Sequence, residues 1–213
     1  MIEPTDGWVA TEVAEEFPGL DLAWVVVEAV PGPGTRESRE RLQHLSSRMR
    51  GDHAVALRQL PIPRAYREFF RQVGLDPDTH RTPVEAAVLD RLLRGGFMSR
   101  NLVDDALTIA LVETGVPLWA LDASTVDGPL GIRLAVAGET LGRRPSAPPL
   151  VPDRLVVADA TAPLAVLFGD LAPGHGVRSA TRSIAFFAVR VPGVPAVHVE
   201  EALWEATEAL GPG

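Results

Sequence analysis

The sequence contains no cysteine, and all 20 of its basic residues are arginine, so lysine is absent as well. Without cysteine the chain can form neither disulfide bonds nor thiolate metal sites, and a cytoplasmic location is the simplest expectation. The absence of lysine, beside many alanines, glycines and prolines, is typical of codon bias in a GC-rich genome. No apolar run approaches the roughly 20 residues that span a bilayer, and the acidic N-terminal segment is unlike a signal peptide, so no membrane partner is expected.

Positive charge is also scarce, because 28 acidic residues outnumber the arginines and give a formal net charge of −8. Tight sequence-independent binding to nucleic acid depends on neutralising phosphates, so this charge argues against it, and no DNA partner is expected. The charge is uneven: residues 1–30 carry seven acids and no base, whereas residues 64–100 carry seven arginines against five acids. A locally basic face can exist on an acidic protein, although so mild an excess is more often a solvated helix surface.

What the 213 residues do contain is enough apolar sequence, 46% of the chain, for one globular core. The run at 20–30 is nearly continuous in apolar residues, so both of its faces are expected to be covered, and Pro18-Gly19 is expected to turn the chain from the strand before it. Periodicity predicts strands over 7–13, 20–30, 117–122, 131–135, 154–159, 163–168 and 184–191, and helices over 35–51, 63–73, 82–95, 101–115 and 195–210. This order predicts a single α+β domain over residues 1–213, with a mixed β-sheet core flanked by helices.

Two of the predicted helices begin at residues that can cap them. Thr82 and Glu85 form a capping box, with Pro83 at the first helical position. Asn101 is expected to be the N-cap of the next helix, with Asp104 in its first turn. Capping is therefore the first role to expect of Asn101 and Asp104.

Eight short segments between about residues 60 and 205 carry a family resemblance. None is specific alone, but their order and spacing resemble the editing domain (B3/B4 domain) of the bacterial phenylalanyl-tRNA synthetase β subunit and the free-standing proteins built from it. The segments are Tyr66-Arg-Glu-Phe-Phe, Gly74-Leu-Asp-Pro, Ser99-Arg-Asn-Leu-Val-Asp104, Gly115-Val-Pro-Leu-Trp-Ala-Leu-Asp122, Asp127-Gly128, Gly138-Glu-Thr140, Leu155-Val-Val-Ala-Asp159 and Val177 to Thr181. The resemblance implies a B3/B4-like fold for the whole domain.

In that family the domain hydrolyses tyrosine wrongly esterified to the phenylalanine tRNA, so the resemblance implies an aminoacyl-tRNA partner and an ester hydrolase. An aminoacyl ester is already reactive, and a site that positions water and stabilises the developing oxyanion can suffice. The chain accordingly has no Gly-x-Ser-x-Gly motif and no cysteine nucleophile. No metal or organic cofactor is implied, because the five histidines are scattered without ligand spacing.

The resemblance also marks the substrate pocket. Three polar pocket residues of the family correspond to Leu107 (or Ala106, if a gap shifts the alignment), Trp119 and Pro173, and Asp122 closes the strand beside them. Leu107, Trp119, Asp122 and Pro173 are therefore the expected substrate-binding residues. In such a pocket, buried polar side chains reject an analogue that gains or lacks a hydroxyl. This chain has leucine, tryptophan and proline at the three positions, which argues against a tyrosine-selective pocket of the family type.

Three residues are candidates for catalysis: His175, Asn101 and Glu139. His175 lies between two glycines on a loop and could approach an ester as acid or base, although a solvated loop histidine is the commoner outcome. Glu139 follows Gly138 and equally suits a turn or a salt bridge with an arginine such as Arg133.

The residues expected to face tRNA are arginines of the mildly basic region, namely Arg64, Arg67, Arg71 and Arg100. If they gather at the pocket mouth they support tRNA binding, whereas dispersal over the helices supports a different function. The first hypothesis is a trans-acting aminoacyl-tRNA editing hydrolase, or a degenerate relative of one. The alternative is a non-catalytic module that binds RNA, an amino acid or a protein, and a structural partner is a third possibility. The sequence does not predict an oligomeric state.

Overall fold

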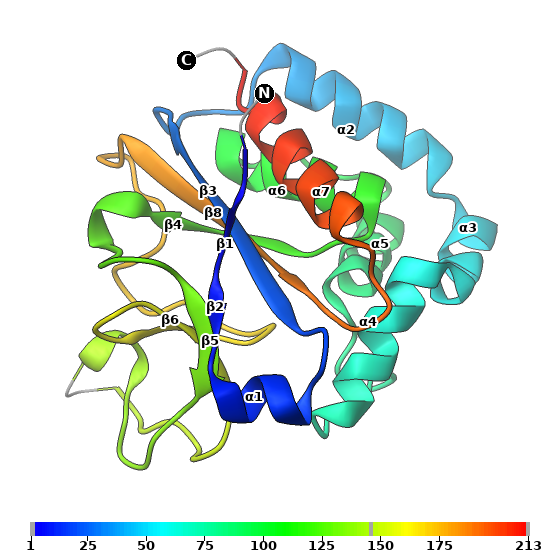
Figure 1. Ribbon diagram of the computed structural model, residues 1–213. Helices are drawn as coiled ribbons and strands as arrows, with labels where there is room; N and C mark the ends of the chain where they lie inside the picture. The colour runs from blue at the N-terminus through cyan, green and yellow to red at the C-terminus, as the bar shows by residue number, and fades with distance from the viewer. Residues whose placement is uncertain (1–2, 145–146, 212–213) are drawn as a thin grey trace.

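The computed structural model describes residues 3–144 and 147–211, and of residues 52–54 only the backbone (Figure 1). Eight strands form two four-stranded sheets in the described residues. The antiparallel sheet has the order β1-β3-β8-β4, and the mixed sheet has the order β2-β5-β6-β7 with β2 parallel to β5. The strands are β1 (Thr5–Asp6), β2 (Trp8–Val9), β3 (Asp21–Glu28), β4 (Leu118–Asp122), β5 (Gly131–Leu134), β6 (Leu155–Ala158), β7 (Pro163–Val166) and β8 (Ser183–Arg190).

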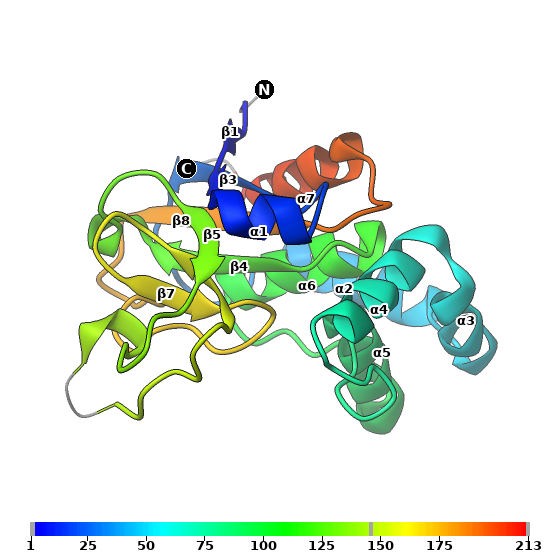
Figure 2. The same cartoon turned by 60° about the horizontal axis from the view of Figure 1, so that its bottom comes forward.

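The helices are α1 (Thr11–Glu16), α2 (Arg36–Arg48), α3 (Gly51–Ala56), α4 (Pro61–Gln72), α5 (Pro83–Arg94), α6 (Leu102–Thr114) and α7 (Ala196–Ala209), with short 3₁₀ turns at Leu57–Gln59, Ala123–Thr125 and Leu141–Arg143. Helices α2 to α7 gather on the other side of the antiparallel sheet from the mixed sheet, with α6 and α7 packed against each other, whereas α1 lies beside β5 (Figures 1 and 2). Within the described chain, no helix has the length and apolar character needed to cross a membrane. The α+β class is confirmed.

Several sequence predictions near the N-terminus and along α2 are wrong. The strand expected at 7–13 ends at Val9 because α1 begins at Thr11 and buries Val13 while its other positions stay exposed or partly exposed. The expected turn at Pro18-Gly19 is present, but the strands on either side of it belong to different sheets, since β2 joins the mixed sheet and β3 the antiparallel sheet. Both faces of the strand over 20–30 were expected to be covered, but Val26 in the second half of β3 is 44% exposed. The helix expected over 35–51 ends at Arg48.

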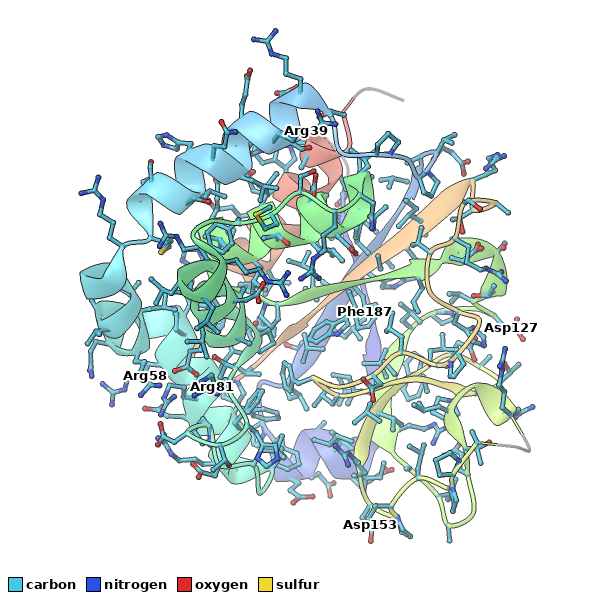
Figure 3. The ribbon with its side chains drawn as sticks, turned by 180° about the vertical axis from the view of Figure 1, so that it is seen from behind. Arg39, Arg58, Arg81, Asp127, Asp153 and Phe187 are labelled. Carbon is cyan, nitrogen blue, oxygen red and sulfur yellow. The ribbon has the colours of Figure 1, made fainter. Side chains whose placement is uncertain are left out.

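An aromatic cluster joins the antiparallel sheet to α4. Phe187 of β8 lies at the centre of the molecule (Figure 3) and stacks on Trp119 of β4, with ring centroids 5.5 Å apart. Phe168, which follows β7, places its ring 5.8 Å from Trp119 and 5.9 Å from Tyr66 of α4. The Tyr66 hydroxyl donates to the carbonyl oxygen of Val189 at 2.8 Å. These contacts hold one face of Trp119 firmly against the core.

Candidate functional site

A cavity of about 440 Å³ lies where the N-terminus of α6 meets β4 and the loop that precedes β8. We call it the α6 cavity. It is lined by Pro31, Gly32, Asn101, Val103, Asp104, Leu107, Trp119, Ala120, Leu171, Gly176, Val177, Arg178 and Ser179. The cavity thus brings together Asn101, Leu107 and Trp119, three of the residues that the sequence singled out.

Burial separates the lining into an apolar interior and a polar mouth. Val103 and Ala120 are buried, and Leu107 and Trp119 are half-buried. The polar side chains are the accessible ones, since Asn101, Arg178 and Ser179 are exposed and Asp104 is half-buried. This arrangement suits a ligand whose apolar end enters the cavity and whose polar, charged part stays at the mouth.

The first turn of α6 forms one wall of the cavity. The prediction that Asn101 caps this helix is confirmed, because its side-chain oxygen accepts the Asp104 N–H at 2.9 Å. The Asn101 amide in turn donates to the Asp104 carboxylate at 2.8 Å. The Leu102 N–H donates to the carbonyl of Gly32, but the described residues offer no acceptor to the N–H of Val103. The Val103 N–H, at the positive end of the helix, thus has no hydrogen-bond partner among the described residues, and Val103 is one of the residues that line the cavity.

The buried carboxylate of Asp105 fixes the segments next to the first turn of α6. Asp105 is 1% exposed and accepts hydrogen bonds from the hydroxyls of Ser38 and Ser99 and from the Arg100 N–H, at 3.1, 2.6 and 2.9 Å. Gly34 fits because a Cβ there would collide with this carboxylate. Asp105 thereby ties the first turn of α2 to the segment before α6.

At the opposite side of the mouth, Asp122 organises the end of β4. The expected turn is confirmed, since the Asp122 carboxylate accepts from the N–H and the hydroxyl of Ser124 at 3.1 and 2.6 Å. It also accepts from the Thr181 hydroxyl at 2.7 Å, and the Arg178 guanidinium lies 3.5 Å away. Burial alone would raise the pKa of Asp122, but the hydrogen bonds from Ser124 and Thr181 outweigh burial and hold that pKa below its ordinary value of 3.8. Asp122 itself does not line the α6 cavity.

The pKa of Asp122 has a consequence for acid stability. A carboxyl whose pKa is lowered by folding stabilises the protein above its unfolded pKa, and this contribution disappears as the pH falls through the folded pKa. We therefore expect the free energy of unfolding to fall as the pH drops below about 3.8. In urea titrations, Asp122→Asn should lose less stability than the wild type between pH 5 and acid pH; equal losses would contradict the assignment.

Besides Asp122, three further residues predicted for catalysis or substrate binding lie outside the cavity lining. The His175 ring instead contacts the Thr125 hydroxyl at 3.1 Å, although Gly176 beside it does line the cavity. Glu139 forms a bidentate salt bridge with Arg133, at 2.5 and 2.8 Å, as predicted. The hydrogen bonds from Arg133 lower the pKa of Glu139. Pro173 is exposed and also does not line the cavity.

The four predicted tRNA-facing arginines are dispersed. Arg67 is 7% exposed and pairs with Glu85 and Asp78 at 2.6 and 2.7 Å, so its guanidinium is unavailable to RNA. Arg64 and Arg71 are exposed on α4, and Arg100 is exposed near Asp90 of α5. Arg58 contacts Glu85 and Asp78, the same two acidic residues that pair with Arg67. It lies among the helices at the edge of the molecule, away from Phe187 (Figure 3). None of the four lines the α6 cavity.

The arginine that does line the cavity, Arg178, was missed by sequence reasoning. The signal available was its place in the segment Val177 to Thr181, just before the last strand. The Val103 N–H was also missed, although the first N–H groups of any helix lack acceptors within that helix. Over the described residues, no three histidine or acidic side chains are grouped so as to hold a metal ion.

Comparisons with known proteins match the part of the chain that supplies most of the cavity lining. The family model described as the B3/4 domain matches residues 65–193. The phenylalanine–tRNA ligase β subunit of Xanthomonas oryzae pv. oryzae is 36% identical over 94 residues, which are 44% of this chain and 12% of that subunit. The same subunit of Chromobacterium violaceum is 36% identical over 113 residues, 50% of this chain and 14% of that subunit. The chain thus matches a small part of the length of these relatives.

Proposed function

Because this chain belongs to the B3/4 domain family, we propose that its α6 cavity receives the aminoacyl end of an aminoacyl-tRNA and promotes hydrolysis of the ester. The observation that carries the proposal is the cavity itself, which combines an apolar interior, a backbone N–H without a partner among its lining residues and a carboxylate at its mouth. The related ligase subunits are named for a tRNA substrate, which supports tRNA as the carrier of the ester.

In the proposed reaction the aminoacyl side chain lies between Leu107 and Trp119. The ester carbonyl oxygen faces the Val103 N–H, which stabilises the negative charge that develops when water attacks the carbonyl carbon. The Asp104 carboxylate accepts a hydrogen bond from that water and takes its proton. The bond to the ribose oxygen then breaks, the ribose oxygen receives the proton, and a free amino acid and an uncharged tRNA end remain.

The apolar interior also indicates which side chains are accepted. Leu107 offers no hydrogen-bonding group, and the polar group of Trp119 is its indole N–H donor, so neither side chain can accept a hydrogen bond from a ligand hydroxyl. An apolar pocket discriminates against an added hydroxyl by about 10²-fold at most. We therefore expect phenylalanyl esters to be preferred over tyrosyl esters on the same tRNA.

The proposal is tested by following the loss of labelled phenylalanine or tyrosine from the phenylalanine tRNA in the presence of purified protein. Asp104→Asn should slow hydrolysis by about 10²-fold, the usual contribution of a proton acceptor. Leu107→Trp should block the cavity, whereas Leu93→Trp, a change at an exposed leucine of α5, should have no effect. His175→Ala should retain activity because its ring lies outside the cavity lining. Hydrolysis no faster than the spontaneous reaction would refute the proposal.

A second candidate function is a binding module for amino-acid derivatives that does not act on tRNA. The dispersal of Arg64, Arg67, Arg71 and Arg100 away from the cavity favours it. In that case an aminoacyl amide would bind in the α6 cavity, while the protein would neither bind tRNA nor accelerate ester loss.

A further inference from the structure

Arg178 at the mouth of the α6 cavity is held in place at both of its ends. Its backbone N–H donates to the Thr181 hydroxyl at 3.0 Å, and that hydroxyl donates to the buried Asp122 carboxylate at 2.7 Å. The Arg178 guanidinium lies 3.5 Å from the same carboxylate. Thr181 and Asp122 are 2% and 4% exposed, so the anchor is part of the core while the arginine reaches outward.

The guanidinium remains accessible despite this anchor. The Arg178 side chain is 59% exposed, and Asp122 is its one ion-pair partner within 4.0 Å among the described residues. A guanidinium carries five N–H donors in a planar fork, so a single carboxylate contact leaves donors that can meet a second anion. Holding the side chain in advance also lowers the entropy lost on binding.

From this geometry we infer that Arg178 binds a phosphate of the ligand, and that Asp122 is the positioning residue that aims it. The inference rests on the proposed function. An aminoacyl ester has no free carboxylate, so the anions nearest to it in aminoacyl-tRNA are the backbone phosphates. The 5′-phosphate of the terminal adenosine is separated from the ester by one ribose. With the aminoacyl group inside the cavity, that phosphate lies outside its mouth, where Arg178 is exposed.

This assignment explains how an acidic protein can engage tRNA without a broad basic face. One pre-positioned arginine beside the pocket gives a local contact, whereas Arg64 and Arg71 lie on α4, away from the cavity lining. Binding of this kind should depend weakly on salt, because few phosphates are neutralised.

The test uses two stable amide analogues, 3′-deoxy-3′-(L-phenylalanylamino)adenosine and its 5′-phosphate, with Kd measured by calorimetry. The phosphate should tighten binding to the wild type by about tenfold, a typical gain for one charge-assisted contact. Arg178→Ala should abolish this gain, so that the variant binds the two analogues with the same Kd. The matched control is Arg182→Ala, which alters an exposed arginine of the same loop that does not line the cavity and should keep the gain.

The outcomes separate the inference from the proposed function. If both analogues bind the wild type and the phosphate gain persists in Arg178→Ala, the role of Arg178 is refuted while the proposed function stands. If both bind the wild type equally, the phosphate contact is absent and the inference is again refuted. If neither analogue binds the wild type, the proposed function fails and the inference fails with it.

Discussion

Replacing Glu85 by alanine is expected to lower the free energy of unfolding by about 3–5 kcal/mol. Glu85 is 6% exposed and accepts from Arg67 at 2.6 Å through one oxygen, which also lies 3.0 Å from Arg58. Its other oxygen accepts from the hydroxyl and N–H of Thr82, which confirms the predicted capping box. The variant would leave the buried Arg67 cation with Asp78 as its remaining partner and would remove a helix cap at the same time.

A double variant separates the two effects of this change. In Glu85→Ala with Arg67→Met, the buried cation that has lost Glu85 is also removed, so the double variant should be more stable than Glu85→Ala alone. Both are measured by urea unfolding at pH 7. A Glu85→Ala protein within about 0.5 kcal/mol of the wild type, the range of ordinary surface changes, would contradict the buried ion pair.

Replacing Asp105 by alanine is expected to cost about 3 kcal/mol and to weaken ligand binding in the α6 cavity. The carboxylate is the shared acceptor for Ser38, Ser99 and Arg100, and Ser38 is 2% exposed, so without it the Ser38 hydroxyl keeps only the Thr35 carbonyl as a partner. A hydrogen bond to a charged group contributes about 1.5–3 kcal/mol, and three donors lose this acceptor. The loops that carry Gly32 and Asn101 would also lose their common anchor.

The control for this prediction is Asp105→Asn, which keeps one acceptor oxygen and nearly the same shape. It should lose about half as much stability as the alanine variant, because a neutral acceptor makes weaker hydrogen bonds. Gly34→Ala tests the same contact from the other side, since its Cβ would collide with the carboxylate. Asp105→Ala with wild-type stability would show that the three hydrogen bonds contribute nothing.

Features that depend on neighbouring residues were predictable from the sequence. The caps at Asn101 and Thr82, the turn at Asp122 and the Arg133–Glu139 pair each join residues no more than six positions apart. Their geometry follows from local backbone preferences, so a short motif determines it. Leu107 and Trp119 were placed at the pocket because the family resemblance fixed their positions along α6 and β4.

The remaining features depend on contacts between distant segments. The division of the strands into two sheets depends on β2 pairing with β5, more than 100 residues later in the chain. Arg67 was expected to be exposed because α4 reads as amphipathic, but α5 and the preceding loop cover it with Glu85 and Asp78. Residues 175 and 176 face different surroundings, since the loop pairs with β4 through Leu121 and Gly176. Sequence spacing alone could not tell which of these neighbours reaches the cavity.

The most direct test of the central claim is a crystal structure of the protein with 3′-deoxy-3′-(L-phenylalanylamino)adenosine. We expect the phenylalanyl ring between Leu107 and Trp119, the amide oxygen accepting the Val103 N–H, and the adenosine outside the mouth beside Arg178. Density for the aminoacyl group at any other surface, or a reversed ligand with the adenine inside the α6 cavity, would contradict the account.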